Sequence, residues 1–332
     1  MLDLLRKPVF DPEKEIPSLS GKVILITGGT GGLGRETVVS FASHDPAHIY
    51  FTGRSQPSAD ETIRLAKEKS PNTPVEFVKC DLASFASIKV AAKDLLAKMN
   101  RLDILMANAG IMAHPPGLTE DGYELQFGTN HVGHALLVKL LTPLLLQTAA
   151  PAAAAEEQTE KKDVRIIWDS SLAHRGHPAC GIDFSKLKTD MADIVPRPLQ
   201  SAAGPWIRYA QSKLANMIYA RAFAQHYPQI TSVSLHPGVS ATGLIGGLSM
   251  GQKAFMYATS WPIMIPAHMC AWNQQWAATA PLGSGERQVE SGTFYMPVGK
   301  KGETSAKGRD KGLEQKLWEW TEEELKGQSL EE

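Results

Sequence analysis

Tyr209 and Lys213 stand four residues apart in the segment YAQSK. On a helix this spacing places both side chains on one face, one turn apart. A tyrosine hydroxyl has a pKa of about 10, which is too high for efficient proton transfer at neutral pH. A neighbouring ammonium group favours the phenolate and lowers that pKa. The pair could therefore exchange a proton with a carbonyl oxygen, or it could be an incidental pair on a helix surface.

A glycine-rich segment, TGGTGGLGRE, spans residues 27–36. Its glycines Gly28, Gly32 and Gly34 follow a β-branched apolar run and precede a helical pattern, which is the context of a dinucleotide-binding turn. Glycines at such a turn let a pyrophosphate approach the unpaired backbone N–H groups of a helix N-terminus. We therefore expect a dinucleotide site here, and a purely structural turn is the alternative.

The end of the second expected strand indicates which dinucleotide binds, because a carboxylate there would bind the ribose 2′-hydroxyl and repel a 2′-phosphate. The segment FTGRS has Arg54 instead, and Arg35 follows the glycines. Two guanidinium groups suit a phosphate, since each can donate two hydrogen bonds to it. The sequence therefore predicts NADP(H) over NAD(H). Asp81, at the end of the third expected strand, should lie beside the adenine, although a strand-end cap explains it nearly as well.

The elements that must position these residues alternate between strand and helix patterns. Helical patterns cover residues 35–43, 84–99, 122–147 and 209–226, and residues 193–206 suggest an irregular loop. The alternation implies parallel strands joined by crossovers, so we expect an α/β fold: a single-domain, Rossmann-type, doubly wound parallel sheet with helices on both faces. The expected strands are 22–29, 48–54, 75–82, 102–110, 164–171 and 231–238.

No composition break divides the chain of 332 residues. We expect an N-terminal extension at 1–20, a catalytic domain at 21–300 with a substrate lid at about 239–270, and a C-terminal tail at 301–332 with a short helix. Residues 147–163, rich in Ala and Glu, suggest a solvated extension.

Composition favours a soluble intracellular enzyme. Hydrophobic residues make up 43% of the chain and the formal net charge is −1, so no global field would recruit nucleic acid or an anionic membrane. The three cysteines are far apart in sequence, which is typical of free thiols in a reducing compartment. The N-terminus lacks an apolar run long enough for a signal peptide or anchor. We expect a cytoplasmic protein without a membrane span, and a shallow membrane contact by residues 254–270 is the alternative.

Six motifs occur in one order: TGGTGGLG, ANAG at 107–110, Asn130, the Ser170–Ser171 pair, YAQSK and HPG at 236–238. In this arrangement the chain resembles the short-chain dehydrogenase/reductase superfamily over roughly residues 21–298. The segments FGTNHVGHALL, SSLAHRG, YAQSKLAN and SLHPGV are similar to the branch that contains retinol dehydrogenases and the WW-domain oxidoreductase.

The resemblance implies a catalytic tetrad of Asn130, Ser171, Tyr209 and Lys213. Tyr209 would be the acid in carbonyl reduction and the base in alcohol oxidation, Lys213 its electrostatic tuner, and Ser171 the hydrogen-bond donor to the carbonyl oxygen, with Ser170 as the alternative. Asn130 would hold a water in the proton relay. The residues expected to contact NADP(H) are Thr27, Gly28, Thr30, Gly32, Leu33, Gly34, Arg35, Arg54, Asp81, Leu82, Asn108, Ala109, Gly110, Tyr209, Lys213, Pro237, Gly238, Val239 and Thr242.

Other polar residues invite alternative interpretations. His131 and His134 stand three residues apart, but no third ligand or zincin spacing is evident, so no metal site is expected. Asp169 precedes the serine pair, where the family usually has an uncharged residue. An unpaired buried carboxylate is costly, so Asp169 could bond to the backbone, to a loop group or to the substrate.

Substrate specificity is expected in two segments. Ser171 and Tyr209 are 209 − 171 = 38 residues apart, which implies an inserted loop over the active site. The expected lid residues Leu244, Ile245, Leu248, Met250, Phe255 and Met256 predict a lipophilic pocket.

We therefore expect an NADPH-dependent carbonyl reductase, equivalently an alcohol dehydrogenase, acting on a retinoid-, steroid-, terpenoid- or polyketide-like compound. The last two classes would connect it to secondary metabolism. The alternatives are a cofactor-assisted redox-neutral catalyst and a non-catalytic NADP(H)-binding regulator on the same fold. The resemblance allows a homodimer and also a monomer.

Overall fold

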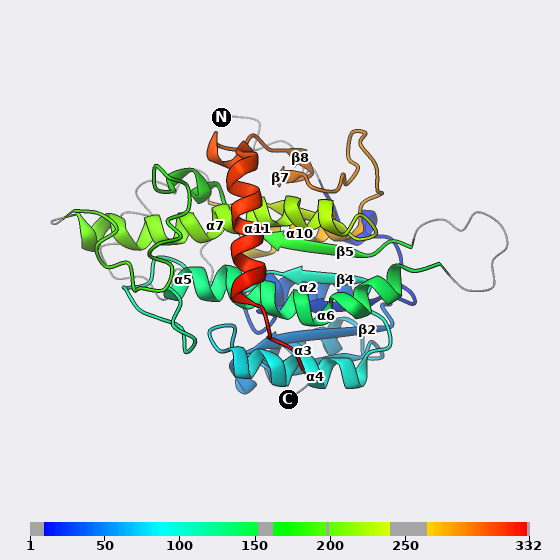
Figure 1. Ribbon diagram of the computed structural model, residues 1–332. Helices are drawn as coiled ribbons and strands as arrows, with labels where there is room; N and C mark the ends of the chain where they lie inside the picture. Colours follow the sequence, from blue (N-terminus) through cyan, green and yellow to red (C-terminus); the bar gives the residue numbers. More distant parts are fainter. Residues whose placement is uncertain (1–9, 152–161, 197–198, 240–263, 331–332) are drawn as a thin grey trace.

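One eight-stranded sheet forms the centre of the molecule in the computed structural model, which describes residues 10–151, 162–196, 199–239 and 264–330 (Figure 1). The strand order is β3-β2-β1-β4-β5-β6-β7-β8. The strands from β3 to β7 run parallel, whereas the two-residue β8 pairs antiparallel with β7. The predicted doubly wound α/β sheet is confirmed.

The strands expected from the sequence are present, and their residues explain why they form. All residues of β1, β4, β5 and β6 are buried, as expected for parallel strands covered on both faces. Two short strands near the C-terminus were not expected, and they extend the sheet beyond β6. The bounds are β1 Val23–Ile26, β2 His48–Gly53, β3 Val75–Lys79, β4 Ile104–Ala107, β5 Arg165–Asp169, β6 Thr231–Leu235, β7 Phe294–Met296 and β8 Lys300–Lys301.

Helices cover both faces of the sheet, and each face has its own apolar core. One core contains residues of α2, α3 and α10, together with the chain around the short α1. The other contains residues of α4, α6, α7 and α11. The bounds are α1 Pro12–Glu15, α2 Gly32–Ala42, α3 Gln56–Lys69, α4 Phe85–Lys98, α5 Leu125–Phe127, α6 Gly133–Ala149, α7 Gln200–His226, α10 Ala267–Thr279 and α11 Lys311–Glu324.

Three expectations about helices were wrong in detail. The predicted loop at 193–206 ends early because α7 already begins at Gln200 and contains Pro205. The Gln126 side chain donates to the Pro205 carbonyl oxygen, at 2.9 Å, which anchors the early turns of α7. Residues 267–270, expected in the lid, instead begin the buried helix α10. The helix α3 was not predicted, although Ser55 caps it and a proline lies in its first turn.

The C-terminal helix α11 lies across α7 and α6 (Figure 1). Leu313 and Leu317 are buried beneath it. Trp318 stacks on His226 of α7 with ring centroids 4.0 Å apart, and Lys139 of α6 pairs with Glu322 at 2.8 Å. The tail is therefore part of the same packed core as α6 and α7.

The continuous helical stretch Leu125–Ala149 is long and apolar enough to cross a membrane by length and composition. It includes α5, a π-helical turn at Gly128–Val132, and α6. Within its most apolar window, 78% is buried inside the fold. Such burial is what the core helix of a sheet-centred domain shows.

Candidate active site

A cavity of about 500 Å³ opens at the carboxyl ends of the central strands. In doubly wound folds this edge is where ligands bind, at the point where the strand order reverses. Here the reversal lies between β1 and β4. Of the residues predicted to contact the cofactor, those that line the cavity are Gly28, Thr30, Gly32, Leu33, Arg54, Asp81, Leu82, Asn108, Ala109, Gly110, Tyr209, Lys213 and Pro237.

The other predicted cofactor residues do not line this cavity. Gly34 and Arg35 lie one turn into α2, behind the glycine loop. Gly238 and Val239 continue the chain just past the lining residue Pro237. Thr27 lies fully buried beneath the loop. Thr242 and the six expected lid residues fall outside the described residues.

The glycine loop brings the backbone of α2 close to the cavity. Gly28 has a φ of +70°, and a Cβ there would lie 2.9 Å from the Cα of Ala109. A Cβ on Gly34 would collide with the Gly28 carbonyl oxygen. Gly31, by contrast, borders open space and provides no side-chain cap for α2. The first amides of α2 therefore remain available to an anionic group, and the loop fits a dinucleotide pyrophosphate.

The two arginines predicted to bind a 2′-phosphate have different surroundings. Arg54 follows β2 and lines the cavity. Arg35 instead donates to the carbonyl oxygen of Thr30 at 2.7 Å and to that of Ser58 at 3.3 Å. Arg35 therefore fixes the glycine loop against α3. Asp81 also lines the cavity, and its carboxylate accepts a hydrogen bond from the Ala83 amide at 3.0 Å, which fits its alternative reading as a cap.

A buried network joins the glycine loop to the opposite side of the cavity. The hydroxyl of Thr27 accepts hydrogen bonds from the amides of Asn108 and Ala109, both at 3.0 Å. His134 bridges the Thr27 hydroxyl and the Asn130 carbonyl oxygen, each contact 2.8 Å long. Burial lowers the pKa of His134 to about 4, so its ring is neutral and serves as a structural link.

Asn130, Lys213 and Gly110 meet at one wall of the cavity. A Cβ on Gly110 would lie 3.2 Å from the Asn130 side-chain oxygen and 3.4 Å from the Lys213 ammonium. Asn130 belongs to the π-helical turn, an irregularity that is frequent at functional sites. Its side chain bonds to both backbone groups of Ile111, at 2.8 and 3.0 Å, and to the Ser212 hydroxyl at 2.9 Å.

The two serines after β5 point to different partners. The Ser170 hydroxyl donates to the carbonyl oxygen of Lys213 at 2.7 Å and is buried. The Ser171 side chain instead lies close enough to Tyr209 to lower the tyrosine pKa. It also accepts from the Ala173 amide at 3.1 Å, which holds the start of the inserted segment. The geometry therefore places Ser171 beside the phenol.

Known proteins of similar sequence identify the family. The short chain dehydrogenase family model matches residues 22–154. A short-chain dehydrogenase/reductase of Armillaria gallica is 36% identical over 94% of this chain and 93% of its own length. The chain belongs to the short-chain dehydrogenase/reductase family. The human polyprenol dehydrogenase is 29% identical over 94% of this chain and 86% of its own length.

Solved structures of this family share the fold. A protein of Mycobacterium paratuberculosis matches with a TM-score of 0.67 and 23% identity, over 95% of this chain and 96% of its own. Two others match with TM-scores of 0.58 and 22% identity. One is a carbonyl reductase from chicken fatty liver bound to NADPH, and the match covers 88% of this chain and 98% of that protein. The other is a short-chain dehydrogenase from M. paratuberculosis bound to NAD, and the match covers 86% of this chain and 98% of that protein. Members of this fold thus bind either nucleotide.

Burial dominates the electrostatics of the tetrad in this family member. It raises the pKa of Tyr209 above its usual value, the Ser171 side chain opposes the rise, and the charge of Asp169 adds to it. The expected lowering of the Tyr209 pKa by Lys213 is therefore not found in this form of the protein. Burial likewise lowers the pKa of Lys213, against the attraction of Asp169. The Lys213 ammonium lies 5.7 Å from the centre of the Tyr209 ring.

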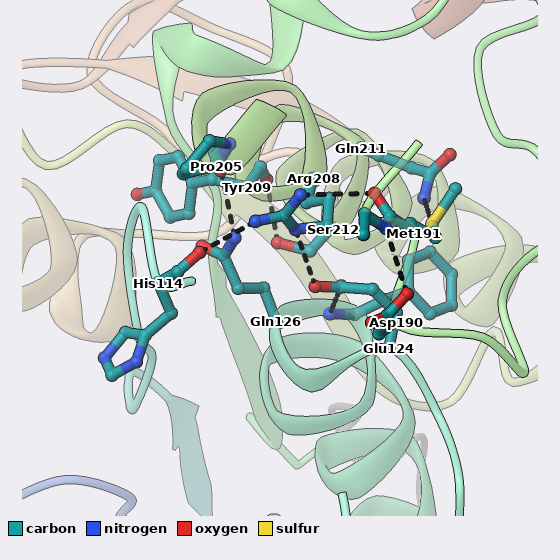
Figure 2. Close-up of polar contacts among 12 residues, drawn as sticks. His114, Glu124, Gln126, Asp190, Met191, Pro205, Arg208, Tyr209, Gln211 and Ser212 are labelled. Carbon is teal, nitrogen blue, oxygen red and sulfur yellow. Dashed lines mark hydrogen bonds and ion pairs between the residues drawn. The ribbon is translucent and has the colours of Figure 1, made fainter. Parts of the chain in front are cut away.

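The sequence did not reveal the buried ion pair beside Tyr209 (Figure 2). Arg208 and Glu124 are both fully buried, with Nε and Oε1 3.3 Å apart. Arg208 also donates to the carbonyl oxygens of His114, at 2.9 Å, and Met191, at 3.2 Å. It thereby ties α7 to the wall of the cavity and to the inserted segment. Both charges were visible within apolar patterns, but their pairing across 208 − 124 = 84 residues was not.

Burial disfavours the charged form of both partners. It raises the pKa of Glu124 to about 7, although the amides of Phe127 and Gln126 and the charge of Arg208 favour the carboxylate. Burial also lowers the pKa of Arg208. The arginine is therefore held chiefly by its two carbonyl partners, and Glu124 by the Phe127 amide at 2.6 Å.

Three apolar side chains contribute to the lining of the cavity. Ile111, Met112 and Leu125 line it, next to His114. None of them was predicted, although three of the four directly follow the ANAG motif in the sequence. We call the part of the cavity around Tyr209 the carbonyl end and the part at the glycine loop the nucleotide end.

Proposed function

We propose that the chain is an NADP(H)-dependent oxidoreductase that transfers hydride between the nicotinamide and a ketone, aldehyde or matching alcohol of a lipophilic compound. One observation carries the proposal: Tyr209 and Lys213 line the same cavity as the glycine loop, and Asn130 lies beside Lys213 at Gly110. This arrangement joins a proton donor to a dinucleotide-binding turn.

When bound, NADPH would supply the hydride. Tyr209 would give its hydroxyl proton to the carbonyl oxygen, and Ser171, which lies beside Tyr209, would hold that oxygen against the phenol. The Lys213 ammonium would stabilise the phenolate that remains, and the positive charge of the oxidised cofactor would add to this effect. Alcohol oxidation would use the same groups in reverse. Asn130 would hold a relay water beside Lys213.

NADP(H) is the proposed nucleotide because Arg54 lines the cavity immediately after β2, where the fold would otherwise place an acid. A guanidinium group can bind a 2′-phosphate through two hydrogen bonds. Arg35 would contribute through the loop that it fixes.

The substrate would be lipophilic because Ile111, Met112 and Leu125 contribute apolar side chains to the lining of the cavity. The name of the human relative, a polyprenol dehydrogenase, also refers to a long apolar alcohol. A retinoid-, steroid-, terpenoid- or polyketide-like carbonyl compound fits this lining, and the last two would suit a role in secondary metabolism.

The family resemblance allows a homodimer as well as a monomer, and the position of α11 bears on where a homodimer could form. Helix α11 packs on α7, and Trp318 and Glu322 contact α7 and α6 respectively. Subunits of this superfamily often pair through these two helices, so α11 occupies a surface that a homodimer would need.

The proposal is tested by titrating the protein with NADPH and NADH, followed by NADPH consumption across a panel of lipophilic ketones and aldehydes. Tight NADPH binding with turnover of a bulky carbonyl compound is expected. Tight NADPH binding without turnover of any carbonyl compound would instead favour a regulator or a redox-neutral catalyst. Product analysis distinguishes these two alternatives, because only the catalyst forms a product. A preference for NADH would contradict the role given to Arg54.

A further inference from the structure

Asp169 is a carboxylic acid inside the catalytic end of the cavity. It is the last residue of β5, is 5% exposed and lines the cavity beside Tyr209 and Lys213. Its backbone carbonyl oxygen accepts hydrogen bonds from the Lys213 ammonium at 2.9 Å and from the Asn216 amide at 3.1 Å. Lys213 is thus positioned by the backbone of Asp169, which leaves the carboxyl group for another role.

The carboxyl group itself is unpartnered among the described residues, where no hydrogen bond or ion pair reaches it. A buried carboxylate without a partner is costly, so a group that enters the cavity is the natural source of compensation. The strands on either side of β5 show which part of the cavity Asp169 occupies. Register pairs Asp169 with Leu235 of β6, and Trp168 with Ala107 of β4. Asp169 is therefore level with Asn108 on one side and lies two residues before the level of Pro237 on the other, and all three residues line the cavity at the expected nicotinamide position.

We propose that the Asp169 carboxylate is a counter-charge for the oxidised nicotinamide ring, so that the site binds NADP⁺ more tightly, relative to NADPH, than it would with a neutral residue. This inference rests on the proposed function. The two cofactor forms differ at the ring by one positive charge, so a carboxylate that faces the ring distinguishes them. For charges a few ångströms apart in a partly buried site, the expected discrimination is about tenfold or more.

Such a counter-charge would shift the equilibrium between the bound substrates and the bound products. Carbonyl reduction moves a hydride from NADPH to the carbonyl carbon and a proton from Tyr209 to the carbonyl oxygen, leaving NADP⁺ and an alcohol. A carboxylate that stabilises NADP⁺ favours this product side. It also offsets part of the positive charge of Lys213, which would otherwise repel the oxidised ring.

The preference should depend on pH in one direction. Burial raises the pKa of Asp169, opposed by the charge of Lys213, so the counter-charge develops as the pH rises. The titratable groups that interact with its charge are Tyr209 and Lys213 from α7. The neighbouring histidines are His134 of α6, which interacts with Lys213, and His236, the residue after the register partner Leu235. Burial lowers the pKa of both histidines to about 4, so their rings are neutral across this range. Loss of the Lys213 proton would act in the same direction, and a variant that lacks only the Asp169 charge separates the two effects.

The test uses Asp169→Asn, which keeps the shape of the side chain, and Asp169→Glu, which keeps its charge. Asp94→Asn is the matched control, because Asp94 is an exposed carboxylate on α4 that pairs with Lys98. The dissociation constants of NADP⁺ and NADPH are measured for each protein by quenching of tryptophan fluorescence, from about pH 5.5 to about pH 8.5.

In wild-type protein and in Asp94→Asn, the affinity for NADP⁺ relative to NADPH should increase with pH. Asp169→Asn should lower the affinity for NADP⁺ relative to NADPH by about tenfold at the highest pH measured. The ratio of the two affinities should then depend less on pH than in wild-type protein. Asp169→Glu should keep the preference. Equal changes in both dissociation constants, or no change, would overturn the inference. If wild-type protein binds neither form, the proposed function fails instead. Should Asp169→Asn not fold, the pH dependence of the wild-type ratio decides alone, and a ratio that stays constant overturns the inference.

Discussion

The two ends of the cavity are held in place in different ways. At the nucleotide end, Gly28 lets the loop approach the backbone of Ala109, and Gly34 lets α2 approach the Gly28 carbonyl oxygen. At the carbonyl end, Arg208 joins Glu124 to the carbonyl oxygens of His114 and Met191, which lie far from each other in sequence. The glycines that permit the first set of contacts stand together in one short motif, whereas the carbonyl end depends on a pairing of buried charges that no motif reveals.

The largest expected effect separates chemistry from nucleotide binding. Tyr209→Phe removes the proton donor at the carbonyl end while the ring still fills its buried position. We expect kcat/KM for carbonyl reduction to fall about a thousandfold, with the dissociation constant of NADPH unchanged. Steady-state kinetics and fluorescence titration measure the two quantities. A loss of NADPH affinity as large as the loss of activity would show that the two ends are not separate.

The next effect concerns the stability of the carbonyl end. Arg208→Met removes the guanidinium that holds two carbonyl oxygens and leaves Glu124 buried without its ion-pair partner. We expect the free energy of unfolding to fall by about 3 kcal/mol, as measured by denaturant titration. Arg208→Met/Glu124→Gln should recover part of the loss, because the amide oxygen can still accept from Phe127.

Arg208→Met should have little effect on nucleotide binding. In folded Arg208→Met, the dissociation constant of NADPH should stay within about twofold of the wild-type value, because Arg208 contacts no part of the glycine loop. A larger change would mean that the inserted segment also shapes the nucleotide end.

A smaller effect should be confined to the nucleotide end. Arg54→Ala removes the cavity-lining guanidinium, so NADPH affinity should fall about tenfold while NADH affinity changes little. Arg35→Ala is the informative comparison, because Arg35 bonds to the carbonyl oxygen of Thr30 in the loop. Arg35→Ala should lower the affinity for both NADPH and NADH. If Arg54→Ala lowered the affinities for NADPH and NADH equally, the assignment of the phosphate site would be wrong.

The smallest effect lies outside both ends of the cavity. Lys139 and Glu322 form a partly exposed pair between α6 and α11, at 2.8 Å. Lys139→Ala should lower the free energy of unfolding by less than about 1 kcal/mol, since such pairs gain little over their hydrated state. A larger loss in the same denaturant titration would show that α11 is held by charge, contrary to the packing of Leu313 and Leu317.

The same contrast explains what the sequence could predict. The strands β1 to β6 and the glycine loop followed from apolar runs and from glycine spacing. The convergence of Asn130 and Lys213 followed from the family motifs. Helix α3 could have been predicted from Ser55 and the proline after it, because both favour a helix start.

Other features could not have been predicted, because they depend on tertiary contacts. The early start of α7 places Pro205 in a helix, where Gln126 binds its carbonyl oxygen. The Arg208–Glu124 pair depends on two buried side chains meeting across the cavity wall. The raised pKa of Tyr209 reflects burial, which the residue types at 209 and 213 do not reveal.

The central claim is that this site moves hydride from the nicotinamide to a carbonyl carbon. The most direct test supplies NADPH deuterated at C4, one stereoisomer at a time, with a carbonyl compound that the protein turns over, and locates the label by mass spectrometry. We expect deuterium from one of the two stereoisomers on the carbinol carbon of the product alcohol, and none with Tyr209→Phe in the same time. An unlabelled product formed while NADPH is retained would contradict hydride transfer and identify a redox-neutral catalyst.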